Sequence, residues 1–164
     1  MMKYMITLIV LMFFANPSEE VDPNLTDEEI KILVDGHNKW RREVGVPDLE
    51  WSETLANSAA KWAAQLKKQN CAFKHSNSKY GENLFTGTTG YYDASSAIQS
   101  WGEEIKYYNY KKNSCKPGKM CGHYTQMVWK TTTKVGCAKV TCDGRDTWVC
   151  QYDPPGNYVG RKPY

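Results

Sequence analysis

The chain has 164 residues, which is enough for one domain with a buried core and too few for two such domains. Hydrophobic residues make up 41% of the chain and aromatic residues 13%, which is typical of a globular protein and excludes a disordered one. The 21 basic and 18 acidic residues are scattered along the chain and give a formal net charge of +3. Because no basic block or base-stacking pattern stands out, nucleic acid is not expected as a partner.

The N-terminal residues predict a secretory signal peptide. Lys3 precedes an apolar run over residues 6–15, which is about ten residues long and too short to span a bilayer. We therefore expect residues 1–18 to be a signal peptide, with cleavage after Ala15 or Ser18, and the mature protein to be secreted without a transmembrane anchor. The alternative, a buried core helix, is less favoured because the run starts at the terminus and no second such segment follows.

The six cysteines indicate disulfides formed in an oxidising, extracellular compartment. A structural zinc site is the rival use of cysteine, but no C-x-x-C pair occurs in the chain. Asn24 opens the sequon Asn24-Leu25-Thr26 and is therefore a candidate for glycosylation in a secreted protein.

Three helices are predicted from capping residues followed by apolar residues at helical spacing. The capping residues are Thr26, Ser52 and Asp93, and the three patterns end before Gly45, around residue 70 and at about Ile105. His37 lies on the apolar stripe of the first helix, which favours a hydrogen-bonded core histidine over a metal ligand. In the third helix, Glu104 is expected to reach inward, while Glu103 is expected to face solvent.

A β-hairpin is predicted near the C-terminus, with strands over residues 135–142 and 146–152 and a type I′ turn at Asp143-Gly144. This register places Cys137 opposite Cys150, in a site where side chains are closest, so we expect a Cys137–Cys150 disulfide. Cys115 and Cys121 flank a turn and are expected to pair locally, which leaves Cys71 with Cys142. Residues 80–85 are the candidate for a third strand. Helices first and a hairpin last indicate an α+β fold in which helices cover a small antiparallel sheet.

Two long motifs resemble the signatures of the CAP superfamily, the cysteine-rich secretory, antigen-five and pathogenesis-related class-one proteins. They are residues 122–129 (GHYTQMVW) and 150–158 (CQYDPPGNY). Four shorter motifs fall in the family's order: His37-Asn38 with Arg41, His75-Ser76, residues 81–84 (GENL) and residues 101–104 (WGEE). The resemblance covers residues 26–164 as a single domain and is closest to the plant members. It implies a three-layer α-β-α sandwich and the same pairing of the six cysteines.

The resemblance also implies a central cleft that contains His75, Glu82, Glu104 and His123. Two neutral imidazoles are good zinc ligands, and two carboxylates can bind the metal or orient the histidines. The set could therefore hold Zn²⁺ or another divalent cation, and two carboxylates brought together would raise one pKa. The alternative is a buried polar network that fastens a loop to a helix and has no chemical role.

The function that the resemblance implies is binding of a sterol or other lipid by a secreted defence protein, with no catalytic residue assigned. Phe85, Tyr91 and Tyr92 lie in a stretch that we expect to be a mobile loop closing over an apolar ligand. One alternative is a metal-dependent hydrolase. Another is a precursor whose C-terminal residues 154–164 are released as a signalling peptide that binds a protein receptor. The competing interpretation of these residues is a tail that packs back over the sheet through Tyr158 and Tyr164.

Overall fold

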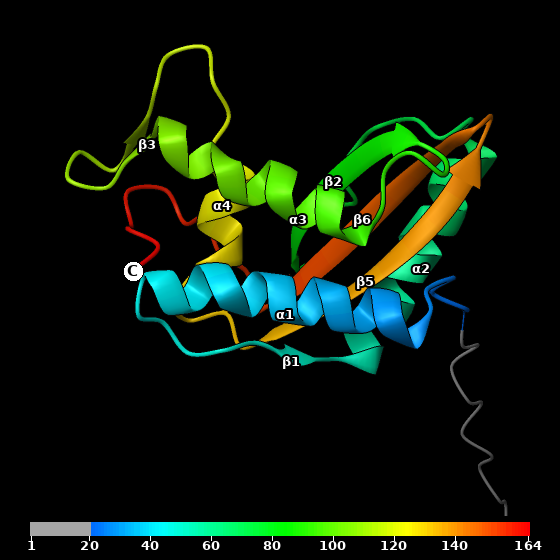
Figure 1. The fold of residues 1–164 in the computed structure, drawn as a ribbon, viewed down its shortest axis with the longest axis horizontal. Helices are drawn as coiled ribbons and strands as arrows, with labels where there is room; N and C mark the ends of the chain where they lie inside the picture. The colour runs from blue at the N-terminus through cyan, green and yellow to red at the C-terminus, as the bar shows by residue number, and fades with distance from the viewer. Residues whose placement is uncertain (1–20) are drawn as a thin grey trace, which may run out of the picture.

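A four-stranded sheet separates helices on its two faces in the computed structural model, which describes residues 21–164 (Figure 1). Helix α2 (Glu53–Lys68) packs against β5 and β6 on one face, whereas α1 (Asp27–Glu43), α3 (Ala94–Gly102) and α4 (Gly122–Met127) gather on the other. This arrangement confirms the predicted three-layer α-β-α fold class. The expected signal peptide lies outside the described residues.

The three long helices begin at the capping residues that the sequence predicts. The hydroxyl of Thr26 accepts a hydrogen bond from the backbone N–H of Glu29, and the Glu29 carboxylate accepts one from the backbone N–H of Thr26 at 2.8 Å. Ser52 and Asp93 accept the corresponding bonds at the starts of α2 and α3. Each cap satisfies a backbone donor that a helix terminus otherwise leaves without a partner.

The third helix is shorter than predicted. It ends at Gly102 and continues as the 3-10 helix η1 (Glu103–Tyr107). A 3-10 helix has about three residues per turn instead of about 3.6, so the inward and outward faces shift along η1. Ile105, expected on the inner face, is 37% exposed, whereas Glu104 does turn inward and Glu103 faces solvent as predicted.

The sheet has the strand order β1-β5-β6-β2, in which β5 (Lys134–Cys142) and β6 (Arg145–Asp153) form the predicted hairpin. Both turn residues, Asp143 and Gly144, have positive φ angles of 49° and 73°, as a type I′ turn requires. The register places Cys137 opposite Cys150, as predicted.

Two features of the sheet differ from the sequence prediction. Strand β2 (Gly81–Thr88) pairs with β6 along its whole length, so it extends three residues beyond the expected strand. Residues 85–88 therefore belong to the sheet, and the expectation of a mobile loop there is wrong. In addition, β1 (Glu50–Trp51) pairs in parallel with β5, where only the start of a helix was expected.

Both faces of the sheet are buried by apolar side chains. Leu33, Trp101 and Tyr124 belong to the core on the side of α1, α3 and α4. On the other side, alanines of α2 pack against Ala138 and Val149. The small alanines let α2 approach the sheet closely.

Three disulfides join the chain in the pairs that the sequence predicts. Cys71–Cys142 ties the end of α2 to the end of β5, and Cys137–Cys150 crosses the central hairpin. Cys115–Cys121 ties the small hairpin of β3 (Tyr108–Asn109) and β4 (Ser114–Cys115) to the start of α4. Within residues 21–164, no helix is both long enough and apolar enough to cross a membrane.

Candidate functional site

The first half of the candidate site is a pair formed by His75 and Glu82. His75 precedes β2, Glu82 is the second residue of that strand, and His75 Nδ1 lies 2.9 Å from Glu82 Oε1. The carboxylate also accepts bonds from the backbone N–H of Ser76 at 2.8 Å, the Ser76 hydroxyl at 2.6 Å and Gln151 Nε2 at 3.0 Å. Four donors thus hold the Glu82 side chain, which is only 5% exposed, whereas that of His75 is 60% exposed.

The second half is a pair formed by His123 and Glu104. His123 lies in the first turn of α4, Glu104 lies in η1, and His123 Nδ1 is 2.7 Å from Glu104 Oε1. The other carboxylate oxygen accepts the backbone N–H groups of His123 and Tyr124 at 3.0 and 3.2 Å. Glu104 therefore caps the N-terminus of α4, where its negative charge is attracted to the positive end of the helix dipole. The indole of Trp101 stacks on the imidazole with centroids 6.2 Å apart.

The four predicted residues form two separate pairs. Asn83, next to Glu82, donates a hydrogen bond to the backbone oxygen of His123 at 3.0 Å and so links the pairs. Within residues 21–164, no three His, Cys, Asp or Glu side chains come together as a metal-binding group. Each carboxylate holds its own histidine and orients its imidazole.

The orientation has a chemical consequence for both histidines. When Nδ1–H of a neutral imidazole donates to a carboxylate, the lone pair of Nε2 remains available to a proton or a cation. His75 and His123 both have this arrangement in their neutral form. Each imidazole supplies one of the four ligands that zinc normally takes.

Gln151 was not among the predicted site residues, although it holds Glu82 in place. It lies directly opposite Glu82 in the ladder between β2 and β6, and its side chain is fully buried. The register of the β5–β6 hairpin could be predicted because one turn fixes it, whereas the register of β2 depends on contacts across a long connection. With that register, the pairing of Glu82 with Gln151 could have been found from the sequence.

The third histidine is structural, as predicted. His37 is fully buried, and its Nδ1 lies 2.7 Å from the backbone oxygen of Leu33. Its Nε2 lies 2.8 Å from the hydroxyl of Tyr152. Burial lowers the pKa of His37 from 6.5 to about 4, so the ring is neutral in the folded protein near neutral pH.

Two of the three predicted ligand-binding aromatic residues meet in a hollow of about 590 Å³ between β2 and α3. The rings of Phe85 and Tyr92 lie edge to face with centroids 5.8 Å apart, and Trp148 lies 5.8 Å behind Phe85. The α3 side contributes Gln99 and Ser100. Tyr91 contacts the Tyr92 ring but is 78% exposed and does not line this hollow.

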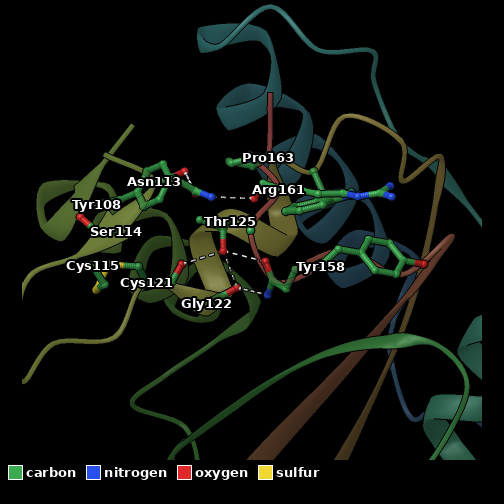
Figure 2. A pocket seen from close by; sticks show the side chains of 13 residues that line it. Tyr108, Asn113, Ser114, Cys115, Cys121, Gly122, Thr125, Tyr158, Arg161 and Pro163 are labelled. Carbon is green, nitrogen blue, oxygen red and sulfur yellow. Dashed lines mark hydrogen bonds between the residues drawn. A yellow bond between two sulfur atoms is a disulfide. The ribbon is translucent and has the colours of Figure 1, made fainter. Parts of the chain in front are cut away.

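The C-terminal tail packs on α4 and the β3–β4 hairpin instead of on the sheet. Tyr164 stacks on Tyr110 with centroids 4.6 Å apart, and the backbone oxygen of Pro163 accepts the N–H of Lys130 at 2.7 Å. A cavity of about 320 Å³ lies between the tail and the hairpin, with Thr125 of α4 in its lining (Figure 2). The hydroxyl of Thr125 donates a hydrogen bond to Asn157 Oδ1 at 2.7 Å. The prediction that the tail packs back on the protein is confirmed, but the surface that it covers, α4 and the hairpin instead of the sheet, was predicted wrongly.

Asn24, the predicted glycosylation site, is exposed just before α1. Its side-chain amide lies 3.4 Å from the backbone oxygen of Lys139, and the hydroxyl of Thr26, the third residue of the sequon, is already engaged in the cap of α1. Glycosylation of Asn24 stays a prediction.

Comparisons with known proteins agree with the fold and the motifs. A model of the cysteine-rich secretory protein family, CAP, matches residues 34–152. Pathogenesis-related protein PR-1 of Medicago truncatula is 41% identical over 168 residues, which cover 99% of this chain and 96% of that protein.

Two solved structures extend the agreement to three dimensions. Venom allergen-like protein 4 of Schistosoma mansoni is 30% identical with a TM-score of 0.68, and the match covers 85% of this chain and 95% of that one. The structure of NaASP2 with Zn2+ is 25% identical with a TM-score of 0.69, and the match covers 90% and 88% of the two chains. This chain therefore belongs to the cysteine-rich secretory protein (CAP) family and has plant pathogenesis-related PR-1 proteins among its relatives.

Proposed function

We propose that this protein is secreted and binds a sterol or a similar amphipathic lipid in defence, without transforming it chemically. The observation that carries the proposal is the hollow between β2 and α3. Its volume of about 590 Å³ falls within the range of small-molecule sites, roughly 300–1,000 Å³. The rings of Phe85 and Tyr92 offer apolar surface to the body of a sterol, and the rest of the lining is polar or charged, with Ser100 and Arg145 able to bind its hydroxyl.

The hydrogen bonds of the His/Glu site support binding over hydrolysis. The Ser76 hydroxyl donates to Glu82 and to no histidine, so the site does not contain the Ser–His pair of an activated serine nucleophile. The carboxylates of Glu82 and Glu104 accept four and three hydrogen bonds from fixed donors, which suits a role in holding the structure.

The test is a titration of the purified protein with a fluorescent sterol. We expect saturable binding at micromolar concentration, and we expect the double variant Phe85→Ala/Tyr92→Ala to bind about tenfold more weakly because two ring contacts are lost. Phe73→Ala is the matched control, since Phe73 is 56% exposed and lies outside the hollow. The absence of saturable binding, or an equal loss in the control, would contradict the proposal.

A second candidate function is binding of Zn²⁺ or another divalent cation by His75 and His123. The orientation of both imidazoles by carboxylates favours it, because zinc-binding histidines are commonly held in this way. A structural relative was also solved with Zn2+. A bound cation would supply a positive charge to which an anionic group of a ligand could bind.

Calorimetric titration with zinc tests this candidate without reference to any activity. If both histidines bind one cation, His75→Gln and His123→Gln should each abolish the one-to-one binding. The third histidine, His37, stays in both variants and cannot replace them because both of its nitrogens are engaged in the core. Unchanged zinc affinity in either variant would show that the two histidines do not share a cation.

A further inference from the structure

Positive charge is concentrated on the β3–β4 hairpin, although charged residues are scattered over the chain as a whole. Residues 106–119 contain no acidic residue and five lysines, all exposed: Lys106, Lys111, Lys112, Lys116 and Lys119. This segment alone carries more positive charge than the formal net charge of +3 of the whole protein. Figure 1 shows that it projects at one end of the molecule, beyond α3.

Four of these lysines line a hollow of about 560 Å³ along the hairpin, and no carboxylate lines it. Lys106 forms an ion pair with Glu103 outside the hollow. Among residues 21–164, no carboxylate lies within ion-pair distance of Lys111, Lys112 or Lys116. Three ammonium groups at this hollow are therefore free to meet negative charges from another molecule.

The backbone that carries the lysines is held firmly. The Cys115–Cys121 disulfide anchors the hairpin to α4, and the hydroxyl of Tyr108 donates to Asn113 Oδ1 at 2.7 Å across the turn. Asn113 Nδ2 in turn donates to the backbone oxygen of Arg161 at 3.0 Å. A ligand would meet a largely preformed frame, which reduces the ordering cost of binding.

We propose that this hollow binds an acidic polysaccharide, a linear sugar chain that carries repeated carboxylates. The lysines lie along the hollow, so successive carboxylates of one chain can each meet an ammonium group. Asn109 and Ser114, which also line the hollow, offer hydrogen bonds to sugar hydroxyls. The three disulfides agree with the proposed secretion, which would bring the protein to extracellular polysaccharides.

Single-stranded nucleic acid fits this surface less well because its bases need free aromatic faces. The ring of Tyr107 already carries the ammonium groups of Lys106 and Lys119, at 5.4 and 5.2 Å from its centroid. The ring of Tyr110 lies 4.6 Å from that of Tyr164 and 4.3 Å from the Lys162 ammonium. The rings of Tyr107 and Tyr110 thus already contact ammonium groups and are not free for stacking.

A membrane surface also fits less well. Proteins that bind in the plane of a membrane insert an apolar face beside their cationic residues. The lining of the hollow contains tyrosines, polar side chains and Pro117, but no Leu, Ile, Val, Met or Phe. A hollow is also concave, which suits a narrow chain better than a flat lipid surface.

The experiment measures binding of the whole mature protein to an oligomer of galacturonic acid, with a neutral oligosaccharide of equal length as the reference ligand. We expect saturable binding of the acidic oligomer that weakens as salt is added, and little binding of the neutral one. The variant Lys111→Gln/Lys112→Gln should bind about tenfold more weakly. The matched control is Lys67→Gln/Lys68→Gln, two adjacent exposed lysines at the end of α2, which should bind like the wild type.

Thermal unfolding of both variants checks that the fold is kept, since all four lysines are exposed. Wild-type affinity in the hairpin variant, or an equal loss in the α2 control, would overturn the proposal. Binding of the neutral oligosaccharide as tightly as the acidic one would do the same. Tighter binding to single-stranded DNA or to phosphatidylserine vesicles than to the acidic oligomer would reject the polysaccharide as the partner.

Discussion

The Nε2 atom of His37 lies 2.8 Å from the hydroxyl oxygen of Tyr152 and so joins α1 to β6 across the core. A backbone oxygen can only accept a hydrogen bond, so the Nδ1 atom next to Leu33 must carry the proton and Nε2 must accept from Tyr152. This arrangement exists only for the neutral imidazole. Burial accordingly lowers the pKa of His37 from 6.5 to about 4.

The first prediction is that stability falls as pH falls from about 6.5 to about 4. Above pH 6.5, His37 is neutral in both the folded and the unfolded protein and contributes no pH dependence. Between pH 6.5 and 4, His37 of the unfolded chain binds a proton, whereas His37 of the folded protein does not. The contribution of His37 to this loss in the free energy of unfolding should total about 3 kcal/mol and level off below pH 4.

Chemical denaturation across this pH range measures the effect. His37→Gln should lower stability at neutral pH and flatten the slope, because the variant has no imidazole at this position to take up a proton on unfolding. An unchanged slope in the His37 variant would show that other groups cause the pH dependence.

The second prediction concerns Gly136, where α2 begins to cross β5. A Cβ atom at this position would lie 2.3 Å from the backbone nitrogen of Ala56 and 2.5 Å from the backbone oxygen of Ser52. Backbone atoms cannot rotate away, so Gly136→Ala should cost at least about 2 kcal/mol in the free energy of unfolding. Gly122→Ala is the control, because its nearest atom is 3.9 Å away, and a similar cost in both variants would refute this explanation.

The third prediction separates two adjacent glutamates. Glu104 accepts two backbone N–H groups at the start of α4, so Glu104→Ala should lower the free energy of unfolding by about 2 kcal/mol. Glu103 faces solvent, and its carboxylate accepts hydrogen bonds from the exposed side chains of Gln99 and Lys106, so Glu103→Ala should change stability little. Denaturant unfolding of the two variants gives the comparison; equal stability would mean that Glu104 is not needed as a cap.

The fourth prediction is an order of disulfide reduction. Cys137 and Cys150 are fully buried, whereas Cys115 is partly exposed. A mild reductant should therefore open Cys115–Cys121 before Cys137–Cys150, because the attacking thiolate needs access to a sulfur atom. Alkylation followed by mass spectrometry measures the order. Earlier opening of Cys137–Cys150 would indicate that the sheet opens more readily than its packing suggests.

Local features of the fold could be predicted from the sequence. The caps at Thr26, Ser52 and Asp93 depend on neighbouring residues alone, and the Asp143-Gly144 turn fixes the register of the strands beside it. The change from α3 to η1 could not be predicted in this way. At the point of change, Trp40 of α1 packs so closely on Gly102 that a Cβ atom would lie 2.1 Å from the indole, and the sequence pattern does not report this contact between helices.

The candidate site shows the same division. Its histidines and glutamates could be found by resemblance, but the contacts that hold the two glutamates depend on distant elements. Glu104 meets His123 because η1 packs beside α4, and Glu82 meets Gln151 because β2 pairs with β6. No periodic pattern in the sequence reports either contact.

The many anchors of the C-terminal tail change what a cut in the chain would do. Residues 154–164 are fastened to other elements through Gly156, Asn157, Arg161, Pro163 and Tyr164. Hydrolysis before Pro154 would break one covalent bond and leave all of these contacts in place. The product would be a nicked complex of two chains, and the freed peptide would leave at a rate set by dissociation, so dilution would control its appearance in solution as much as proteolysis does.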